Sequence, residues 1–518
     1  MSPPQNSCTD VEAREDEQED YTVLSPRVQK LVIVLLGMAM LLSPLTATIY
    51  LPLLPLLSAH FHTSAQAINL TITVYIAFQA LSPLLLSSTS DHFGRRPILL
   101  GTFTLYTVAS LGLAINTSSY PALLVLRALQ SLGASAVLSI SYGCVADISV
   151  PAKRGKMLGP MLAAGNVGTC VGPIVGGWVA LVSGGYRWAF WALCIFGGFI
   201  LCALVFLLPE TARQVVGNGS IEDRRWNQPI WRLIRRSGRG THTNASQPRR
   251  SPKVSSPLAA IKILFHKDTP FIIWLSSSYY ALWYCVQATI PSTFKSPIYR
   301  FNELQIGLAY LPGAFGVILS MYVTGKFMDW SYKATADKMG FTINRVKGDD
   351  ITKFPIEDAR SRWCEVLIPL SMCTMVGYGW SIEMAAHVSI PLILQFLQGF
   401  LVTWLIQVFS ALLVDTFPET PSTASTAGNM TRCVVSAVAV AMLQPLIEVM
   451  GKGWLFTFVG LVSGIGGVVS LMILRRRGMK WRTSRRMAYE QCDAGSSSHT
   501  NESSTGYLEK GSSENEKP

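Results

Sequence analysis

Long apolar runs, separated by short polar loops, fill most of this chain. A helix needs about 20 apolar residues to cross a bilayer, and twelve runs approach or exceed that length. The runs at 120–147 and 388–415 are longer than a perpendicular crossing requires, which favours tilt or extension beyond the membrane. The pattern predicts an all-α membrane protein with twelve transmembrane helices, at residues 31–57, 67–90, 97–116, 120–147, 157–182, 187–208, 269–293, 304–327, 364–386, 388–415, 426–449 and 453–474.

Polar stretches divide these spans into two halves of six, at 30–212 and 263–477. A linker rich in Arg, Ser, Asn and Gly joins them, and we expect it in the cytosol together with a loop of mixed charge in the second half. Both ends of the chain are polar, so we expect them to be disordered, because they bury too little apolar surface to fold alone. These segments are the acidic tail 1–29, the linker 213–262, the loop 331–362 and the tail 478–518.

The composition and the placement of charge support a membrane protein. Charged residues make up 14% of the chain and hydrophobic residues 49%, whereas soluble domains are about 25% charged. The net charge of +12 comes largely from Lys and Arg in alternate loops, such as Arg95, Arg96 and the run 475–477. Cytosolic loops carry this excess, which predicts that both termini are cytosolic. Since the basic residues adjoin the spans, the expected partner is the lipid bilayer and not a nucleic acid.

The sequence lacks the motifs that several classes of function require. The 10 cysteines form no Cys-x-x-Cys pair and lie mostly inside spans, where they act as small apolar residues. The sequence contains no Walker phosphate loop, no nucleophile elbow and no metal-ligand cluster. We therefore expect no enzymatic activity, no cofactor and no metal.

A charged hairpin joins the second and third spans and contains Asp91, Gly94, Arg95 and Arg96. It resembles the pattern G-x-L-x-D-x-x-G-R-R/K of the major facilitator superfamily, with Ser87 and Thr89 replacing Gly and Leu. The resemblance covers about residues 30–475 and implies two pseudo-symmetric six-helix halves that alternate access to a central site. In the family these charges latch the cytosolic side of the outward-open state. We also expect the positive N-terminal end of the third span to favour Asp91. The alternative is an ordinary charged loop that sets orientation.

The fourth span carries an arginine at 127, and an arginine inside a span is costly unless it faces protein or water. Arg127, Gln130, Gly133 and Ala134 resemble the family segment R-x-x-Q-G-x-G. In proton antiporters of the family the matching arginine is linked to proton transfer, so Arg127 and the carboxylate of Asp147 are the proton-coupling candidates. A structural arginine tied to backbone carbonyls is the other interpretation.

The fifth span is rich in glycine at four-residue spacing, which lets helices approach closely. Gly168, Gly172, Pro173, Gly176 and Gly177 resemble the antiporter motif, which the family uses mainly in exporters. Proline promotes a bend, so we expect this helix to rock against a neighbour from the other half. A glycine seam that serves only packing is the plain alternative.

Candidate cavity residues follow from the spans that line the centre in the family. Four side chains of the seventh span share one helical face, and aromatic rings with amides suit an organic ligand through stacking and cation–π contact. Two residues of the eleventh span lie in a stretch that resembles the fungal quinidine-resistance and dityrosine-exporter branch. Aromatic packing is the alternative. The candidates are Gln130, Tyr280, Trp283, Tyr284, Gln287, Gln395, Gln398, Asn429 and Arg432.

The resemblance to twelve-span drug:proton antiporters implies a function. We expect a monomeric, proton-coupled secondary transporter that exports a small organic molecule, such as a drug, a fungal secondary metabolite or an organic acid. An uptake or facilitative carrier of the same fold and a membrane transceptor are the alternatives. The expected location is the fungal plasma membrane, with the vacuolar or another internal membrane as the alternative.

Overall fold

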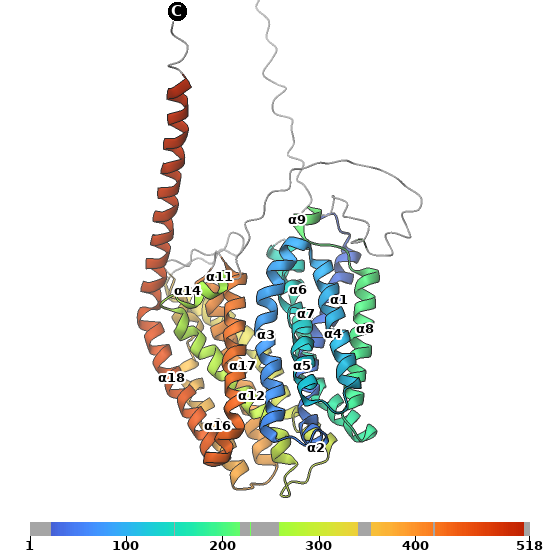
Figure 1. The fold of residues 1–518 in the computed structure, drawn as a ribbon. Coiled ribbons are helices and arrows are strands. Elements are labelled where there is room, and N and C mark those ends of the chain that lie inside the picture. The colour runs from blue at the N-terminus through green and yellow to red at the C-terminus, as the bar shows by residue number, and fades with distance from the viewer. Residues whose placement is uncertain are drawn as a thin grey trace, which may run out of the picture.

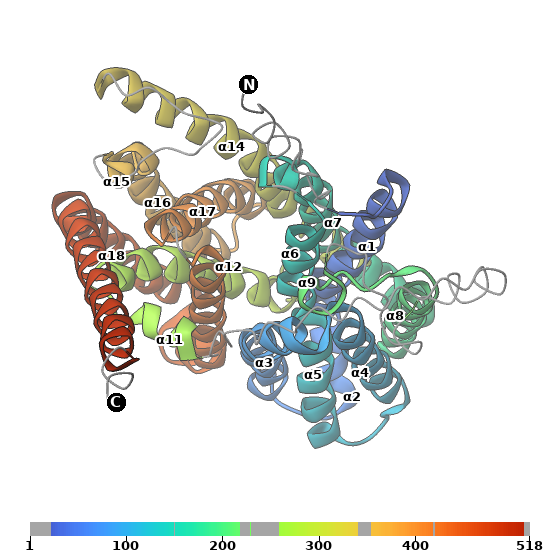
Figure 2. The same ribbon diagram turned by 90° about the horizontal axis from the view of Figure 1, so that it is seen from above.

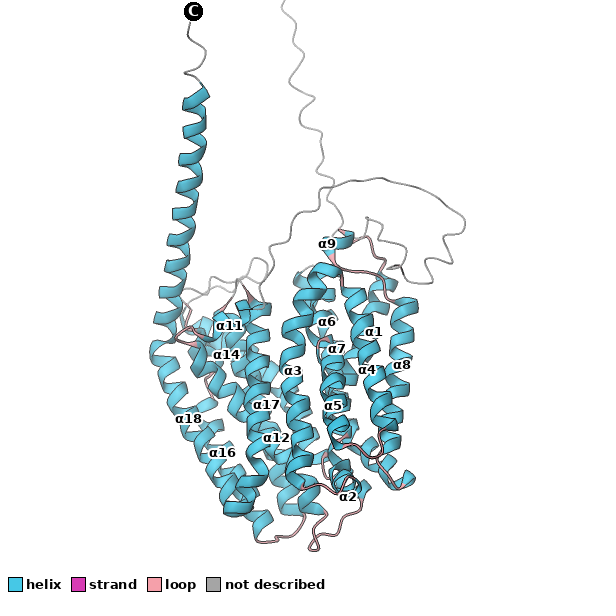
Figure 3. Ribbon diagram, in the orientation of Figure 1, coloured by secondary structure: helices cyan, strands magenta, loops and turns pink. Residues whose placement is uncertain are grey.

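The computed structural model describes residues 22–149, 151–217, 228, 258–339, 354–417 and 420–511. These residues form helices joined by loops, and no strand occurs among them (Figure 3). The acidic tail up to residue 21, most of the linker and the middle of the 331–362 loop lie outside the described residues.

The first half is a bundle of six spans. Polar side chains at the ends of the loops cap the first turns of some of its helices. Ser64 and Ser119, for example, accept hydrogen bonds from the backbone N–H groups of Ala67 and Ala122, as helix N-caps do. The first span breaks after Ile49, where proline follows. The elements are α1 (Pro26–Ile49), η1 (Leu51–Leu53), α2 (Leu54–His60), α3 (Ala65–Phe93), α4 (Arg95–Ile115), α5 (Tyr120–Ser135), α6 (Val137–Ile148), α7 (Pro151–Ser183), α8 (Arg187–Leu207) and the short α9 (Arg213–Val216).

The second half repeats this arrangement, with the last two spans in one helical element. Gly451 divides that element with φ 74° and ψ 169°, a backbone conformation that side chains disfavour. The elements are α11 (Leu258–Leu264), α12 (Thr269–Phe294), α13 (Glu303–Leu308), α14 (Leu311–Met339), α15 (Ile356–Arg360), α16 (Cys364–Glu383), α17 (Ser389–Thr416) and α18 (Pro421–Gly511).

The helices account for the predicted spans. Within the described residues, 9 helical stretches are long and apolar enough to cross a membrane. The last of them, Thr423–Arg485, contains two spans on either side of Gly451, and α12 and α16 occupy two more predicted positions. The arrangement is consistent with twelve spans.

The two halves stand side by side, with the first half in blue to green and the second in yellow to red (Figures 1 and 2). The sides of the bundle are named here by their short helices: the terminus side carries α9 and α11, and the opposite side carries α2 (Figure 1). The halves touch where α3 packs along α18 and where α7 packs against α13.

The C-terminal segment differs from the expected disordered tail. Helix α18 continues past residue 478, and two of its arginines form ion pairs with acids of the second half. Arg482 lies 3.4 Å from Glu357, and Arg485 lies 2.9 Å from Asp268. These pairs hold residues 478–485 against the bundle, and sequence composition alone gives no sign of them.

Candidate functional site

The charged hairpin is tighter than the sequence suggests, because Gly94 alone separates α3 from α4. Its φ of 107° and ψ of 153° lie in a region that favours glycine. A Cβ atom placed there would stand 2.5 Å from a carboxylate oxygen of Glu210. The position therefore requires glycine for two reasons, its backbone angle and its contact.

Glu210, just after α8, is the centre of this hairpin. Its Oε1 accepts hydrogen bonds from the N–H groups of Arg95 (2.8 Å), Thr211 (2.9 Å) and Ala212 (2.9 Å). Its Oε2 accepts one from the N–H of Arg96 at 3.1 Å. The carboxylate is 7% exposed and caps the positive end of α4.

The hydrogen bonds at this helix end go to Glu210, and the expected benefit of the same helix end for Asp91 stays a prediction. Asp91 lies in the last turn of α3, and its carboxylate pairs with the guanidinium of Arg95. Glu210 is not among the site residues predicted from the sequence. The available signal was that Gly94 has no side chain with which to cap α4, so that the cap must come from a distant residue.

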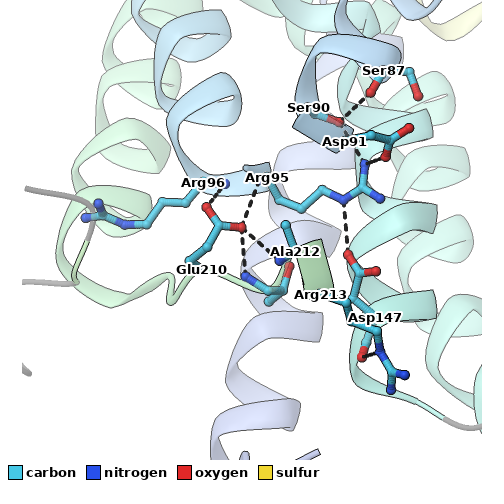
Figure 4. Close-up of polar contacts among 10 residues, drawn as sticks. Ser87, Ser90, Asp91, Arg95, Arg96, Asp147, Glu210, Ala212 and Arg213 are labelled. Carbon is cyan, nitrogen blue, oxygen red and sulfur yellow. Dashed lines mark hydrogen bonds and ion pairs between the residues drawn. The ribbon is translucent and has the colours of Figure 1, made fainter. Parts of the chain in front are cut away.

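The two arginines of the hairpin have different partners (Figure 4). Arg95 binds Asp91 and also Asp147 of α6, where Nε and Oδ2 are 3.1 Å apart. Arg96 is 3% exposed and donates to the backbone carbonyls of Leu208 (2.9 Å) and Val205 (2.8 Å) at the end of α8. Arg95 thus links three spans of the first half through ion pairs. Arg96 instead donates hydrogen bonds to carbonyl groups at the C-terminal end of a fourth span, α8.

Arg127 is fully enclosed in the first half, with 1% of its surface exposed. Its guanidinium carbon stands 4.0 Å from the ring centroid of Tyr50 and 4.3 Å from that of Tyr75, which are cation–π distances. Its Nη1 donates to Gln130 Oε1 at 2.8 Å, and Gln130 Nε2 donates to Ser110 at 2.9 Å. Gln130 is thus a buried partner of Arg127. Aromatic faces hold the arginine, where the structural interpretation expected backbone carbonyls.

The glycines of α7 face two different neighbours. A Cβ atom on Gly168 or Gly176 would strike the backbone carbonyl of Leu41 or Ile49, so these glycines seat α7 on α1 of the same half. A Cβ atom on Gly172 would meet α1 as well, 3.0 Å from the backbone nitrogen of Ile49.

Gly177 instead faces the second half. A Cβ atom on Gly177 would lie 3.2 Å from the Cα of Gly307 in α13, and one on Gly307 would meet the backbone carbonyl of Pro173. The expected contact with the other half is therefore made by Gly177 and Pro173, while the other three glycines pack within their own half.

An aromatic and cationic cluster lies near mid-membrane depth between the halves. The guanidinium of Arg432 is 5.6 Å from the ring centroid of Tyr280, whose ring meets that of Tyr284 edge-on at 5.0 Å. Arg432 and Tyr280 each stand eleven residues from the terminus-side end of their helix, or about 16 Å at 1.5 Å per residue. Tyr142 of α6, which is 39% exposed, lies within electrostatic range of Arg432 from the first half.

Arg432 has no acidic partner among the described residues. Its Nη1 donates to Ser410 Oγ at 2.9 Å and its Nη2 to Asn429 Oδ1 at 3.3 Å, while its Nε has no partner. The predicted residues Tyr280, Tyr284, Asn429 and Arg432 therefore come together. Tyr142 was missed because no motif marks it.

The other predicted cavity residues form separate groups. A Cβ atom on Gly313 of α14 would lie 2.8 Å from Trp283 and 3.0 Å from Gln395 Nε2, which places these two side chains together. Gln395 is completely buried, and neither polar atom of its amide has a partner. Gln398 accepts a hydrogen bond from Thr374 of α16 at 2.7 Å. Gln287 is 6% exposed with an unpartnered Oε1.

Acids on the terminus side of the second half are held by a separate set of arginines. Arg360 of α15 binds Asp415 at 3.0 Å, and Arg475 of α18 binds Glu365 at 3.1 Å. Burial raises the pKa of Glu357, and Arg482 opposes that rise. Among the residues with described side chains, no group of three or more His, Cys, Asp or Glu is placed to hold a metal ion.

Comparisons with known proteins agree with this architecture. The family model described as the Major Facilitator Superfamily matches residues 36–341. The MFS-type transporter phiD of a fungal species is 34% identical over 479 residues, which cover 92% of this chain and 72% of the relative. Citrate exporter 1 of Aspergillus niger is 32% identical over 485 residues, which cover 92% of this chain and 91% of the relative.

A solved structure shows the same fold. The crystal structure of the human organic anion transporter MFSD10 (TETRAN) matches with a TM-score of 0.51 and 18% identity, over 87% of this chain and 100% of that chain. These relatives are named as transporters, which agrees with the absence of enzyme motifs in the sequence. The chain therefore belongs to the major facilitator superfamily and is a multi-pass membrane transporter of the branch found in fungi.

Proposed function

We propose that the protein is a proton-coupled antiporter that exports a small organic molecule carrying negative charge, such as an organic acid or an acidic fungal metabolite. The observation that carries this proposal is Arg432, whose guanidinium lies at mid-membrane depth and has no carboxylate partner in the part of the chain that the structure describes. An uncompensated charge at this depth is costly, and in membrane proteins such a residue marks a substrate or ion path.

The groups around Arg432 favour an organic cargo over an inorganic anion. Tyr280 and Tyr284 offer ring faces and edges, and Tyr142 approaches from the first half. A planar guanidinium binds a carboxylate with two parallel hydrogen bonds, while the rings stack on apolar parts of the same molecule. The presence of a citrate exporter among the relatives is in keeping with an anionic cargo.

Proton coupling is assigned here to Asp147 in preference to Arg127. Asp147 is bonded to Arg95 at 3.1 Å, so protonation of its carboxylate would remove that ion pair and free the hairpin charges. Arg127 is surrounded by tyrosine rings, and an arginine does not release its proton at physiological pH.

The direction of transport and the orientation complete the proposal. The antiporter motif of α7 favours export, and the basic loops place both termini in the cytosol. The close contact of Gly177 with Gly307 on the opposite side supports a conformation closed toward the outside. The same site in an uptake carrier is the alternative that the experiment must separate.

The test is transport by the full-length protein in proteoliposomes with an imposed pH gradient. Citrate, an aromatic carboxylate such as salicylate and an aromatic cation such as ethidium serve as cargoes. We expect movement of at least one anion against the direction of proton flow, a loss of about ten-fold or more in Arg432→Gln, and partial recovery in Arg432→Lys. Lys333→Gln, which removes an exposed charge elsewhere in the second half, is the matched control. Cation transport that is unaffected by Arg432→Gln would contradict the anionic cargo, and anion movement together with protons would indicate uptake.

A further inference from the structure

The basic residues at the end of α18 divide into two sets by helical face. Arg475, Arg482 and Arg485 point to the second half, where each pairs with a carboxylate. Arg476, Arg477 and Lys480 are exposed, and within the described part of the chain they have no hydrogen bond or ion pair. We call these three residues the basic triad. The ion pairs that hold α18 to the bundle do not use it.

The basic triad continues the surface of α18 that faces lipid. Exposed apolar side chains recur at three- and four-residue steps along the last span, as one helical face requires. They are Phe458, Val462, Ile465, Val469 and Met472, all at least 41% exposed. The next steps of the same series are Arg476 and Lys480, and Arg477 lies beside them.

The position of the triad along the helix matches the depth of lipid headgroups. Arg476 is four residues beyond Met472, or about 6 Å, and Lys480 is about 12 Å beyond it. The headgroup layer begins where the hydrocarbon core ends and is about 5–8 Å thick on each side. Long basic side chains on the lipid-facing surface therefore reach the phosphate groups of that layer.

We propose that Arg476, Arg477 and Lys480 form a binding site for the phosphate-bearing headgroup of an anionic lipid in the leaflet on the terminus side. Three cations that form no ion pair within the described residues complement a headgroup with net negative charge, and the apolar series below them accommodates its acyl chains. Anionic lipids are concentrated in the cytosolic leaflet, so the inference rests on the proposed cytosolic orientation. It does not depend on what the protein transports.

The experiment measures lipid binding to the purified full-length protein in detergent, with native mass spectrometry to count bound lipids. The probes are dioctanoyl phosphatidylserine and dioctanoyl phosphatidylcholine at equal concentrations. We expect phosphatidylserine to bind preferentially, and Arg476→Gln with Lys480→Gln to weaken its binding by about 25-fold, or about five-fold per cation. Both residues are exposed and unpaired, so the double variant should unfold at the temperature of the unaltered protein.

A matched double variant tests whether the site is specific. Lys333→Gln with Lys338→Gln removes the same net charge from exposed positions of α14, where Asp329 and Asp337 lie within one turn. This control should weaken phosphatidylserine binding by less than about two-fold. Equal weakening in both double variants, or equal binding of the two lipids, would overturn the proposal. Displacement of phosphatidylserine by an equal concentration of inorganic phosphate would show a free-anion site instead and would also overturn it. Since no transport is measured, failure of the exporter proposal leaves these outcomes unchanged.

Discussion

Replacement of Glu210 should destabilise the first half, and the loss should be smaller for glutamine than for alanine. Its carboxylate accepts four backbone hydrogen bonds, three on Oε1 and one on Oε2. In Glu210→Gln the amide oxygen can keep the three bonds, but the amide nitrogen then faces the N–H of Arg96. We expect a loss of about 2 kcal/mol, the value of one hydrogen bond to a charged group.

Glu210→Ala should cost more, because all four donors lose their acceptor. At the lower limit of about 1 kcal/mol for each unsatisfied group, the loss is about 4 kcal/mol. A unit of 150–250 residues changes its melting temperature by about 2–4 °C per kcal/mol. The first half is of that size, so we expect shifts of about 4–8 °C for glutamine and about 8–16 °C for alanine.

The assay is thermal unfolding of the purified protein in detergent, followed by fluorescence. Glu365→Gln is the control, because that carboxylate is bonded to an arginine but is 62% exposed. Exposed pairs contribute about 1 kcal/mol or less, so its shift should stay below about 4 °C. If the Glu210 variants shift no further than this control, the four bonds do not stabilise the protein. If glutamine is as damaging as alanine, the charge matters and the number of bonds does not.

Three further outcomes are expected. Gly177→Val should abolish transport in the proteoliposome assay while leaving expression intact, because the added side chain blocks contact between the halves. The control variant Gly159→Val should transport normally, because the space around its Cβ position is open. Asp91→Asn and Arg95→Ala should together lose less transport than the sum of their separate losses, since the two groups are bonded, and additive losses would rule out a shared function. Arg485→Gln should lower stability by about 3 kcal/mol, because it leaves a buried aspartate unpaired; a melting temperature like that of the unaltered protein would contradict this.

The sequence was sufficient to predict the architecture, because each span is a long run of apolar residues that is visible in the local sequence. The hairpin and the glycine motif were also recognisable, since each depends on residues that are close in the chain. The partner of α4 was not predictable, because Glu210 is more than one hundred residues away from the helix end that it caps. Pairing at that separation is a property of the folded bundle.

Packing between helices also decides which of the cavity candidates come together. Tyr280 and Tyr284 share a helical face, which spacing predicts, and their contact with Arg432 follows only when α12 and α18 pack together. Gln130 was placed in the cavity by its family position, yet Arg127 and Ser110 engage both ends of its amide. Spacing identifies a face of a helix, but it does not identify the neighbour that covers that face.

The contact between Gly177 and Gly307 has a thermodynamic consequence for the transport cycle. Backbone meets backbone at this point, and the two glycines bring no ionisable side chain to it. Salt at 0.1 M largely screens exposed charges that are more than about 10 Å apart and weakens closer exposed pairs, but it leaves a contact of this kind unchanged. The contact between Gly177 and Gly307 should therefore contribute the same free energy at low and high ionic strength, whereas the half-exposed ion pair of Lys295 with Glu303, the neighbour of these glycines in α13, should weaken as salt is added. Any dependence of the conformational equilibrium on salt thus reports on charged side chains and not on the glycine contact itself.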